Sequence, residues 1–410
     1  MDIMDSPDTE TIAKRVSEDP AHAFLPYPAS PVAHAKAGPL TGLTFAVKDL
    51  FDVAGYPTGG GNPLVLARSG IKQQTAPAIQ ALLDSGARFV GKTVTDELAF
   101  SMNGKNAHFG TPRNGVVPER IPGGSSSGSA AAVSNGLCDF AIGSDTGGSV
   151  RAPGNHCGLF GIRSTHGRVS LERAIPLAPS FDTLGFFARE AEVFARVGAV
   201  VLGDDPPGMT VAVAPQLLRP VDLWELIAPE VAAALAPAVK RIESLFGPTR
   251  AITVVVDGLD TMYWHFRRVQ GFEAWQAHGD FIERYAPPLG PGVAERFAWS
   301  KTVTAAQWST GKAFCDRYRS HLAQLLGTGS ILVLPTMPDV APLLAADETE
   351  LESYRNAAIR LLCIAVLSGF PQVTLPLAAR LGAPLGISLL GPVGSDRALI
   401  ALAKRVADGH

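Results

Sequence analysis

The sequence carries, at residues 121–170, the stretch IPGGSSSGSAAAVSNGLCDFAIGSDTGGSVRAPGNHCGLFGIRSTHGRVS. Two Gly-Gly-Ser elements recur in it, at 123–125 and 147–149, and small residues and the apolar run 140–142 lie between them. Glycine lets backbone amides approach a ligand closely, and serine supplies hydroxyl groups. Amides and hydroxyls that meet at one point can form a nucleophile beside an oxyanion hole, which is what acyl transfer needs.

A flexible Gly/Ser linker is the alternative interpretation of such a composition. Both Gly-Gly-Ser elements, however, border apolar sequence that is typical of strands or helices. Asp145, Arg151, Cys157 and Phe160 also lie close around the second element. We therefore expect an ordered backbone site rather than a linker.

The composition indicates a folded protein with a large core. Of the 410 residues, 46% are hydrophobic and 18% are charged. The net charge of −3 comes without long blocks of like charge, which argues against a nucleic-acid-binding surface. The four cysteines have no CxxC spacing, so we expect buried free thiols in a reducing compartment rather than disulfides or a zinc site.

The sequence lacks the features of a secreted protein and of a membrane protein. The polar N-terminus has no apolar segment of a signal peptide, and the longest apolar run, near 361–367, is well short of the roughly 20 residues that a membrane span needs. We therefore expect a soluble, cytoplasmic protein without membrane contact.

Strand and helix patterns alternate along the chain. Strands are expected in the first half of 43–53 and at 88–92, 209–214, 251–256, 331–335, 372–376 and 386–390. Helical segments are expected at 12–16, 76–85, 97–102, 229–246, 263–285, 354–367 and 396–406. The aromatic side chains of 263–285 are more typical of core packing than of ligand contact. The alternation has no linker-like break, so it predicts one large α/β domain.

Two serine motifs compete for the nucleophile. Residues 124–128 satisfy the G-x-S-x-G pattern of a nucleophile elbow, but the preceding residues 117–122 read as a loop, not as the strand that an elbow requires. A phosphate-binding Walker loop is excluded, because no Lys-Ser/Thr follows the glycines. Ser149 fits better, because Thr146-Gly147-Gly148 places adjacent amides beside it and a helix is expected to begin just after it.

The base that would activate Ser149 is less evident from the residues alone. His156 and His166 lie nearby, but small residues surround each of them and a structural role is the better interpretation. Lys48 lies at the end of a predicted buried strand, where burial would lower its pKa and produce a neutral amine. A surface lysine at a strand end is the simpler alternative, and from the sequence alone it is favoured.

The segment 123–170 closely resembles the amidase signature family, whose core reads GGSS[SG]GS…GSDTGGS[VI]R. The resemblance extends to TFAVKDLFDV around Lys48, to LVLPTMPDVAP (332–342) and to PLGISLLGPVGSDRALIALA (384–403). It implies a single domain, 1–410, in which helices flank a central mixed β-sheet. Within it we expect an N-terminal helix and arm (1–40), a catalytic core (41–190), a variable middle region (191–330) and the C-terminal part of the core (331–410).

The resemblance also implies roles for individual residues. Lys48 would be the catalytic lysine, Ser125 the bridging serine that follows a cis Gly124–Ser125 peptide, and Ser149 the nucleophile. The remaining expected site residues are the oxyanion-hole amides of Thr146, Gly147, Gly148 and Ser149, a lysine-supporting Ser126, and the loop scaffold Asp145 and Arg151. The family chemistry implies no metal and no organic cofactor.

The stretches NGKNAHFGTPRN (103–114) and VQGFEAWQAHG (269–279) look most like indole-3-acetamide amidases. They predict an amidase for a small primary carboxamide with an aryl or other apolar acyl group, since no basic cluster is visible in the sequence. Alternatives are a carboxylated, malonamate-like amide held by Arg151, and the glutaminase subunit of a tRNA amidotransferase. A binding module without catalysis is disfavoured, because the lysine and both serines are present. A homodimer is possible.

Overall fold

In the computed structural model, which describes residues 18–208, 211 and 215–409, a single mixed β-sheet runs through the whole molecule. Its ten strands lie in the order β2-β1-β3-β5-β4-β9-β10-β8-β6-β7. The strands are β1 (Thr44–Lys48), β2 (Arg88–Thr93), β3 (Phe140–Ser144), β4 (Phe160–Arg163), β5 (Leu184–Ala188), β6 (Gln216–Pro220), β7 (Arg250–Ile252), β8 (Ser330–Pro335), β9 (Gln372–Arg380) and β10 (Ala383–Leu390). The predicted single α/β domain with a central mixed sheet is confirmed.

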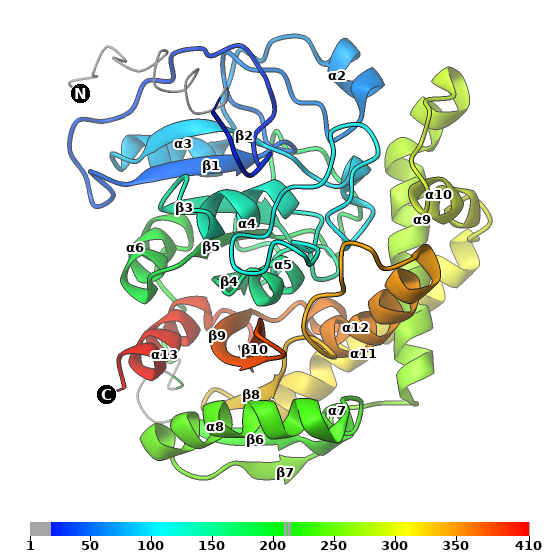
Figure 1. The fold of residues 1–410 in the computed structure, drawn as a ribbon. Helices are drawn as coiled ribbons and strands as arrows, with labels where there is room; N and C mark the ends of the chain where they lie inside the picture. The colour runs from blue at the N-terminus through cyan, green and yellow to red at the C-terminus, as the bar shows by residue number, and fades with distance from the viewer. Residues whose placement is uncertain (1–17, 209–210, 212–214, 410) are drawn as a thin grey trace.

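Helices surround this sheet (Figure 1). They are α2 (Pro63–Ser69), α3 (Pro77–Asp84), α4 (Ser127–Ser134), α5 (Arg151–His156), α6 (Ala191–Val201), α7 (Val221–Trp224), α8 (Pro229–Phe246), α9 (Leu259–Tyr285), α10 (Val293–Ser300), α11 (Ala305–Leu326), α12 (Glu348–Ser368) and α13 (Asp396–Asp408), with one 3₁₀ turn at Glu97–Ala99. Helices α9, α10, α11 and α12 gather on one side of the sheet, and α6 packs with α13 on the opposite side. None of the described helices is long and apolar enough to cross a membrane.

The strand directions change across the sheet. Strands β2, β1 and β3 are parallel, the centre from β3 to β8 is antiparallel, and β8, β6 and β7 are parallel again. In β1 and β3, Phe45 pairs with Phe140 and Val47 with Ile142, and all four are buried. Parallel neighbours end at the same edge of a sheet, so Lys48 and Ser144 at the ends of β1 and β3 come together there.

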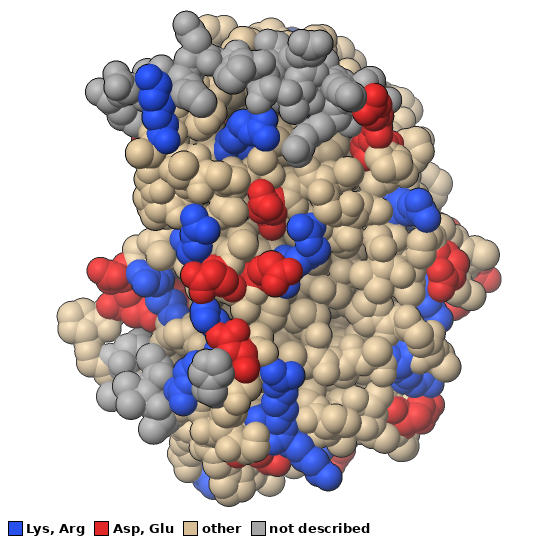
Figure 2. Space-filling view, turned by 60° about the vertical axis from the view of Figure 1, so that its left-hand side comes forward, with Lys and Arg blue, Asp and Glu red and all other residues tan. Residues whose placement is uncertain are grey.

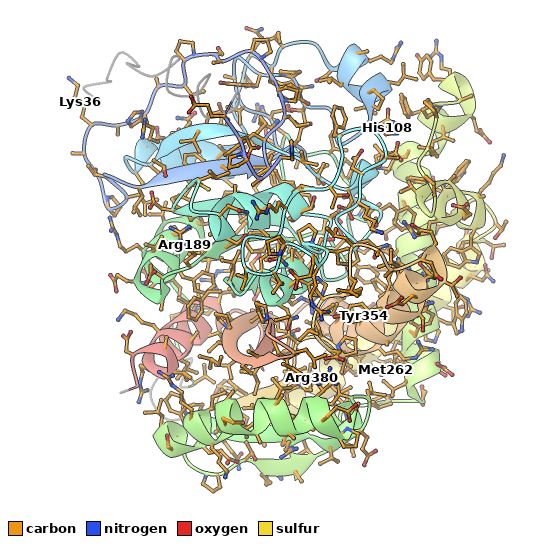
Figure 3. The ribbon with its side chains drawn as sticks, in the orientation of Figure 1. Lys36, His108, Arg189, Met262, Tyr354 and Arg380 are labelled. Atoms are coloured by element: carbon orange, nitrogen blue, oxygen red, sulfur yellow. The ribbon has the colours of Figure 1, made fainter. Side chains whose placement is uncertain are left out.

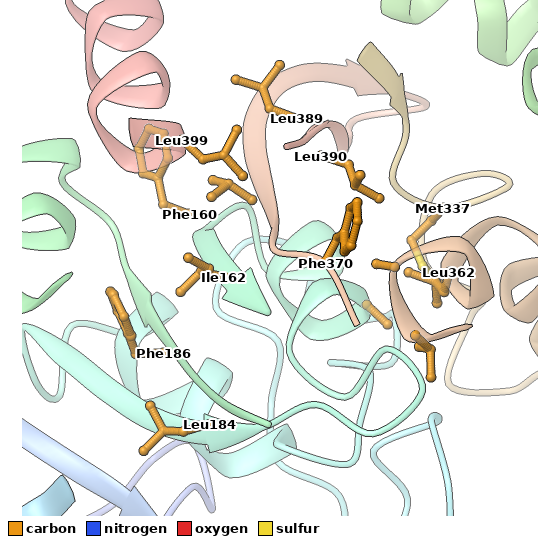
Figure 4. Close-up of a cluster of buried hydrophobic side chains, with 14 of the residues drawn as sticks. Phe160, Ile162, Leu184, Phe186, Met337, Leu362, Phe370, Leu389, Leu390 and Leu399 are labelled. Atoms are coloured by element: carbon orange, nitrogen blue, oxygen red, sulfur yellow. The ribbon is translucent and has the colours of Figure 1, made fainter. Parts of the chain in front are cut away.

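A continuous apolar core holds the helices on the sheet. Figure 4 shows part of it, in which Phe160 of β4 lies near Leu399 of α13, and Ile162 of β4 and Leu184 and Phe186 of β5 continue the core along the sheet. On the other side of the close-up, Met337, Leu362 and Phe370 join this core to α12. Side chains alternate in direction along a strand, so strands buried on both faces, as these are, read as nearly continuous apolar runs.

The expected elements match the observed ones unevenly, and helices such as α10 and α11 were not among those expected. The helix expected at 12–16 lies outside the described residues, as does most of the strand expected at 209–214. The strand expected at 251–256 is the short edge strand β7, and the helical turn expected at 97–102 is only the 3₁₀ turn Glu97–Ala99. All four cysteines are free and buried, as predicted.

Next to the end of β1, a buried ion pair fixes the following turn. Lys92 Nζ of β2 lies 2.8 Å from Asp49 Oδ1, and both side chains are almost completely buried. The other carboxylate oxygen, Oδ2, accepts hydrogen bonds from Tyr27 Oη at 2.7 Å and from the Gly59 amide at 2.9 Å. The residue that follows Lys48 is therefore held by three separate segments.

Lys92→Met should lower the free energy of unfolding by about 3–5 kcal/mol, because it leaves the buried Asp49 carboxylate without its cation. Urea unfolding followed by circular dichroism measures this loss. The matched control is Lys72→Met, whose half-exposed pair with Asp52 has an N–O distance of 3.9 Å and should contribute less than about 1 kcal/mol. Equal losses in the two variants would contradict the assigned importance of the buried pair.

Candidate active site

The predicted lysine and bridging serine lie in direct contact. Lys48 Nζ, fully buried at the end of β1, lies 2.7 Å from Ser125 Oγ and 2.9 Å from Ser144 Oγ. Burial lowers the pKa of Lys48 to about 7, and the carboxylates of Asp96, Asp145 and Asp182 limit this decrease. At neutral pH a large fraction of Lys48 is therefore a neutral amine that can accept a proton.

The peptide before Ser125 is held in place from both sides. The Gly124–Ser125 bond is cis, as the family resemblance implies. The Ser125 carbonyl accepts hydrogen bonds from the Asp96 amide at 3.0 Å and from Thr95 Oγ1 at 2.9 Å. A Cβ atom at Gly124 would lie 2.2 Å from Asp96 Oδ2, so only glycine fits here. Asp96, which sequence reasoning missed, thus packs against Gly124 and donates its amide to the Ser125 carbonyl.

The second serine whose hydroxyl contacts Lys48 is not the expected Ser126. Ser126 was expected to support the lysine, but its Oγ donates to the Ser144 carbonyl at 3.2 Å and accepts from the Ser144 amide at 3.3 Å. The hydroxyl that contacts Lys48 is that of Ser144. Ser126 also donates its amide to the Ser149 carbonyl at 3.3 Å, so it ties the two serine-bearing loops together.

The loop around Ser149 is built on the buried carboxylate of Asp145. Asp145 Oδ1 accepts the Gly148 amide at 2.9 Å and Arg151 Nη2 at 2.9 Å, and Oδ2 accepts the amides of Val150 and Arg151. Burial alone would raise the pKa of Asp145, but the guanidinium groups of Arg151 and Arg163 hold it well below its usual range. Asp145 and Arg151 thus hold the loop together through these contacts.

Arg151 cannot reach a substrate in this arrangement. Its side chain is fully buried, and besides Asp145 it donates to the Leu362 carbonyl at 2.9 Å and to Gln372 Oε1 at 2.7 Å. The alternative in which Arg151 holds the carboxylate of a malonamate-like substrate is therefore wrong.

The bonds to Asp145 also revise the expected oxyanion hole. The Gly148 amide is occupied by Asp145 and is not available to an oxyanion, so that part of the prediction is wrong. The amides of Thr146, Gly147 and Ser149 donate to no acceptor among the described residues. Gly148 itself has φ +131°, and a Cβ atom there would lie 2.5 Å from Leu362, so this position requires glycine. The amides of Thr146, Gly147 and Ser149 remain as candidate donors to an oxyanion, and α5 begins two residues after Ser149.

The two nearby histidines are structural. His156 is buried, which lowers its pKa to about 3, and its Nε2 shares a 3.0 Å hydrogen bond with the hydroxyl of Tyr354, labelled in Figure 3 on α12. His166 Nε2 donates to the Pro179 carbonyl at 2.9 Å. Within the part of the chain that the structure describes, no three His, Cys, Asp or Glu side chains are grouped to hold a metal ion.

Two cavities adjoin the site and both reach Ala99. The first, of about 190 Å³, lies beside Ser144 and Thr146 and is otherwise mainly apolar, with Leu50, Phe51, Leu171, Ile175 and Leu177 in its wall. The second is a narrow cleft that contains Gly147 and Ser149 and is lined by residues 99–102, Phe266, Gln270, Arg355 and Ile359. The aromatic helix α9 thus contributes one ring, Phe266, to the cleft, and most of its other aromatic side chains pack on neighbouring helices.

Comparisons with known proteins agree with this geometry. A family model described as "Amidase" matches residues 21–230. Amidase 1 of Arabidopsis thaliana is 38% identical over 92% of this chain and 96% of its own length. The 2-amino-5-chloromuconic acid deaminase of Comamonas testosteroni is 33% identical over 89% of this chain and 81% of its own. A solved structure described as "Crystal structure of amidase" superposes with a TM-score of 0.81 at 29% identity, covering 97% of this chain and 88% of that one.

The chain therefore belongs to the amidase signature family, and it is an amide-hydrolysing enzyme. The family membership that the motifs at 123–170 predicted is confirmed. The comparisons do not assign the roles of individual residues or the acyl group of the substrate, so these follow from the geometry as proposals.

Ser144→Ala should lower kcat roughly ten-fold and move the rise of activity to lower pH. Wild-type activity should rise through a pKa of about 7, as Lys48 loses its proton. Ser144 accepts a hydrogen bond from Nζ and so stabilises the ammonium form, and its removal lowers the pKa of Lys48 further.

The measurement is kcat/KM against pH. Ser129→Ala, which removes a buried hydroxyl bonded to the Ile142 carbonyl, is the matched control and should keep the midpoint. A midpoint unchanged in Ser144→Ala would contradict the assigned contact.

Proposed function

We propose that this protein hydrolyses a small primary carboxamide to a carboxylic acid and ammonia through an acyl-enzyme on Ser149. The observation that carries the proposal is the buried contact between Lys48 and Ser125, next to three unpaired loop amides. Neutral Lys48 takes a proton from Ser125, Ser125 takes one from Ser149, and the Ser149 oxygen attacks the amide carbonyl. Lys48, Ser125 and Ser149 are the proposed catalytic residues.

The charge that develops on the carbonyl oxygen would be stabilised by the amides of Thr146, Gly147 and Ser149. Each well-placed donor of this kind contributes roughly 3–4 kcal/mol in comparable sites. The proton then returns through Ser125 to the leaving nitrogen, which departs as ammonia, and water releases the acid by the same route in reverse. No step needs a metal or an organic cofactor.

For the acyl group, the apolar cavity beside Thr146 supports the aryl or indole-acetamide type predicted from the sequence. Burial of an aromatic ring contributes at about 25 cal/mol per Å² of apolar surface, which acetamide does not offer. The cavity volume of about 190 Å³ suits a ring of this size. This acyl preference is independent of whether the substrate also carries a charge.

Other predictions from the sequence concern the role, the partners and the location of the whole protein. The alternative role as the glutaminase subunit of a tRNA amidotransferase is less favoured, and Figure 2 shows a face on which acidic and basic side chains are interspersed rather than a basic surface. A small-molecule partner, a cytoplasmic location and a homodimer remain proposals from the sequence.

The test combines covalent labelling with a panel of neutral amides. A fluorophosphonate should label one residue, Ser149, as mass spectrometry of the peptides would show, and Ser149→Ala should release no ammonia. Phenylacetamide and indole-3-acetamide should exceed acetamide in kcat/KM by at least about 100-fold. Labelling at Ser126 would revive the nucleophile elbow and contradict the relay. Equal rates for all three amides would contradict the apolar acyl site.

A further inference from the structure

Beside Ser149, three arginines come together from three helices. Arg267 of α9, Arg296 of α10 and Arg355 of α12 have side chains that are more than nine-tenths buried. Arg355 lines the cleft that contains Ser149, and Arg296 Nε donates to the carbonyl of Phe100 in the same cleft wall at 2.6 Å. Arg267 is not a wall residue of the cleft, but it lies close enough for its charge to act on both Arg355 and Arg296. The three residues are far apart in the chain, which is why the expectation that no basic cluster exists, drawn from the sequence, is wrong.

The positive charge of this cluster is only partly balanced. Glu352 lies 3.1 Å from Arg355 Nη1 and 3.6 Å from Arg296 Nη1, but its side chain is 43% exposed to solvent. Asp96 and Glu295 also attract Arg296 electrostatically. Burial lowers the pKa of Arg355 to about 9, and the neighbouring charges of Arg296 and Arg267 contribute to the decrease. Three buried cations share one close carboxylate, so a second anion would be stabilised here.

The cleft also contains polar atoms without partners. Nε of Arg355, Nε of Arg267 and Oε1 of Gln270 are buried and have no hydrogen-bond partner among the described residues. Buried polar atoms are normally paired, so the two Nε donors, unlike the acceptor Oε1 of Gln270, indicate a place for the acceptor atoms of a ligand. The guanidinium groups are otherwise fixed, because Arg267 Nη1 donates to Tyr263 Oη at 2.7 Å and its guanidinium lies 5.0 Å from the centre of the Trp299 ring. Fixed guanidinium groups are well suited to bind a planar carboxylate.

We propose that Arg355, together with Arg296 and Arg267, forms a carboxylate-binding subsite beside Ser149. The substrate would then be a primary carboxamide that also carries a carboxylate a few bonds from the scissile amide. This inference rests on the proposed function, because it places the carboxylate relative to the amide that Ser149 attacks. The apolar cavity and this cleft, which has a volume of about 10 Å³, share Ala99 in their walls, so the proposed carboxylate subsite lies next to the proposed acyl site.

The test compares two amides that differ only in charge. Succinamate and 4-oxopentanamide have the same length, but a methyl ketone replaces the carboxylate in the second. Wild-type kcat/KM should favour succinamate by at least roughly 30-fold, since a charged hydrogen-bonded pair replaces a neutral contact. Arg355→Met should lower this ratio at least about ten-fold. The control Arg360→Met, on the outer side of the same helix where its partner is the exposed Asp260, should keep the ratio.

Two classes of substrate could supply such a carboxylate, an amino acid and a dicarboxylic monoamide. Asparagine, which adds an α-ammonium group to succinamate, distinguishes them. A rate above that of succinamate assigns the subsite to an amino acid, and a lower rate assigns it to a dicarboxylic monoamide. Either result supports the carboxylate subsite. Equal rates for succinamate and 4-oxopentanamide in the wild type would overturn it.

A binding measurement separates this inference from the proposed function. Calorimetry with succinate on Ser149→Ala protein should detect binding that weakens at least about ten-fold when Arg355→Met is added, whether or not any amide is hydrolysed. If Arg355→Met does not fold, as thermal melting would show, Arg355→Lys serves instead, because lysine keeps the charge but loses the planar donors. Succinate binding that is unchanged by the Arg355 variant would overturn the subsite. Absent turnover with intact succinate binding would overturn only the proposed function.

Discussion

The rest of the active site depends on one constraint, the burial of the Lys48 amine away from water. Strands β1 and β3 run parallel and end at the same edge of the sheet, so Lys48 and Ser144 meet in a fully buried position. There the neutral amine is favoured, and a residue that is ordinarily a cation becomes able to accept a proton from Ser125. Apolar residues of the core, Val47 and Ile142 among them, pack around this end of the sheet.

The loop that carries Ser149 depends on a second buried group, Asp145. Its surroundings favour the charged form, whereas those of Lys48 favour the neutral form. Asp145 stays ionised because Arg151 and Arg163 surround it, and its two oxygens collect the backbone amides of the loop. This arrangement occupies the Gly148 amide, whereas the amides of Thr146, Gly147 and Ser149 have no acceptor among the described residues. One site therefore contains a lysine that burial makes neutral and an aspartate that ion pairing keeps charged.

Much of this could be predicted from the sequence, because the signature residues at 123–170 and the strand before Lys48 are each continuous in the chain. Helix α8 was predicted with its correct ends, whereas α9 and α12 were predicted too short and α11 and the bounds of the short edge strand β7 were not predicted. The contact of Ser144 with Lys48 could not be predicted, since it depends on the register of β1 against β3. The cluster of Arg267, Arg296 and Arg355 was hidden for a similar reason, because only the packing of three helices brings these residues together.

The most direct test of this account is the titration of Lys48 itself. Carbon NMR of protein labelled at lysine Cε, with Lys48 assigned by its absence in Lys48→Arg, reports the protonation of that one amine. The account predicts a midpoint at about pH 7 in the folded protein. A Lys48 resonance that titrates only above about pH 10, as an ordinary lysine does, would contradict it.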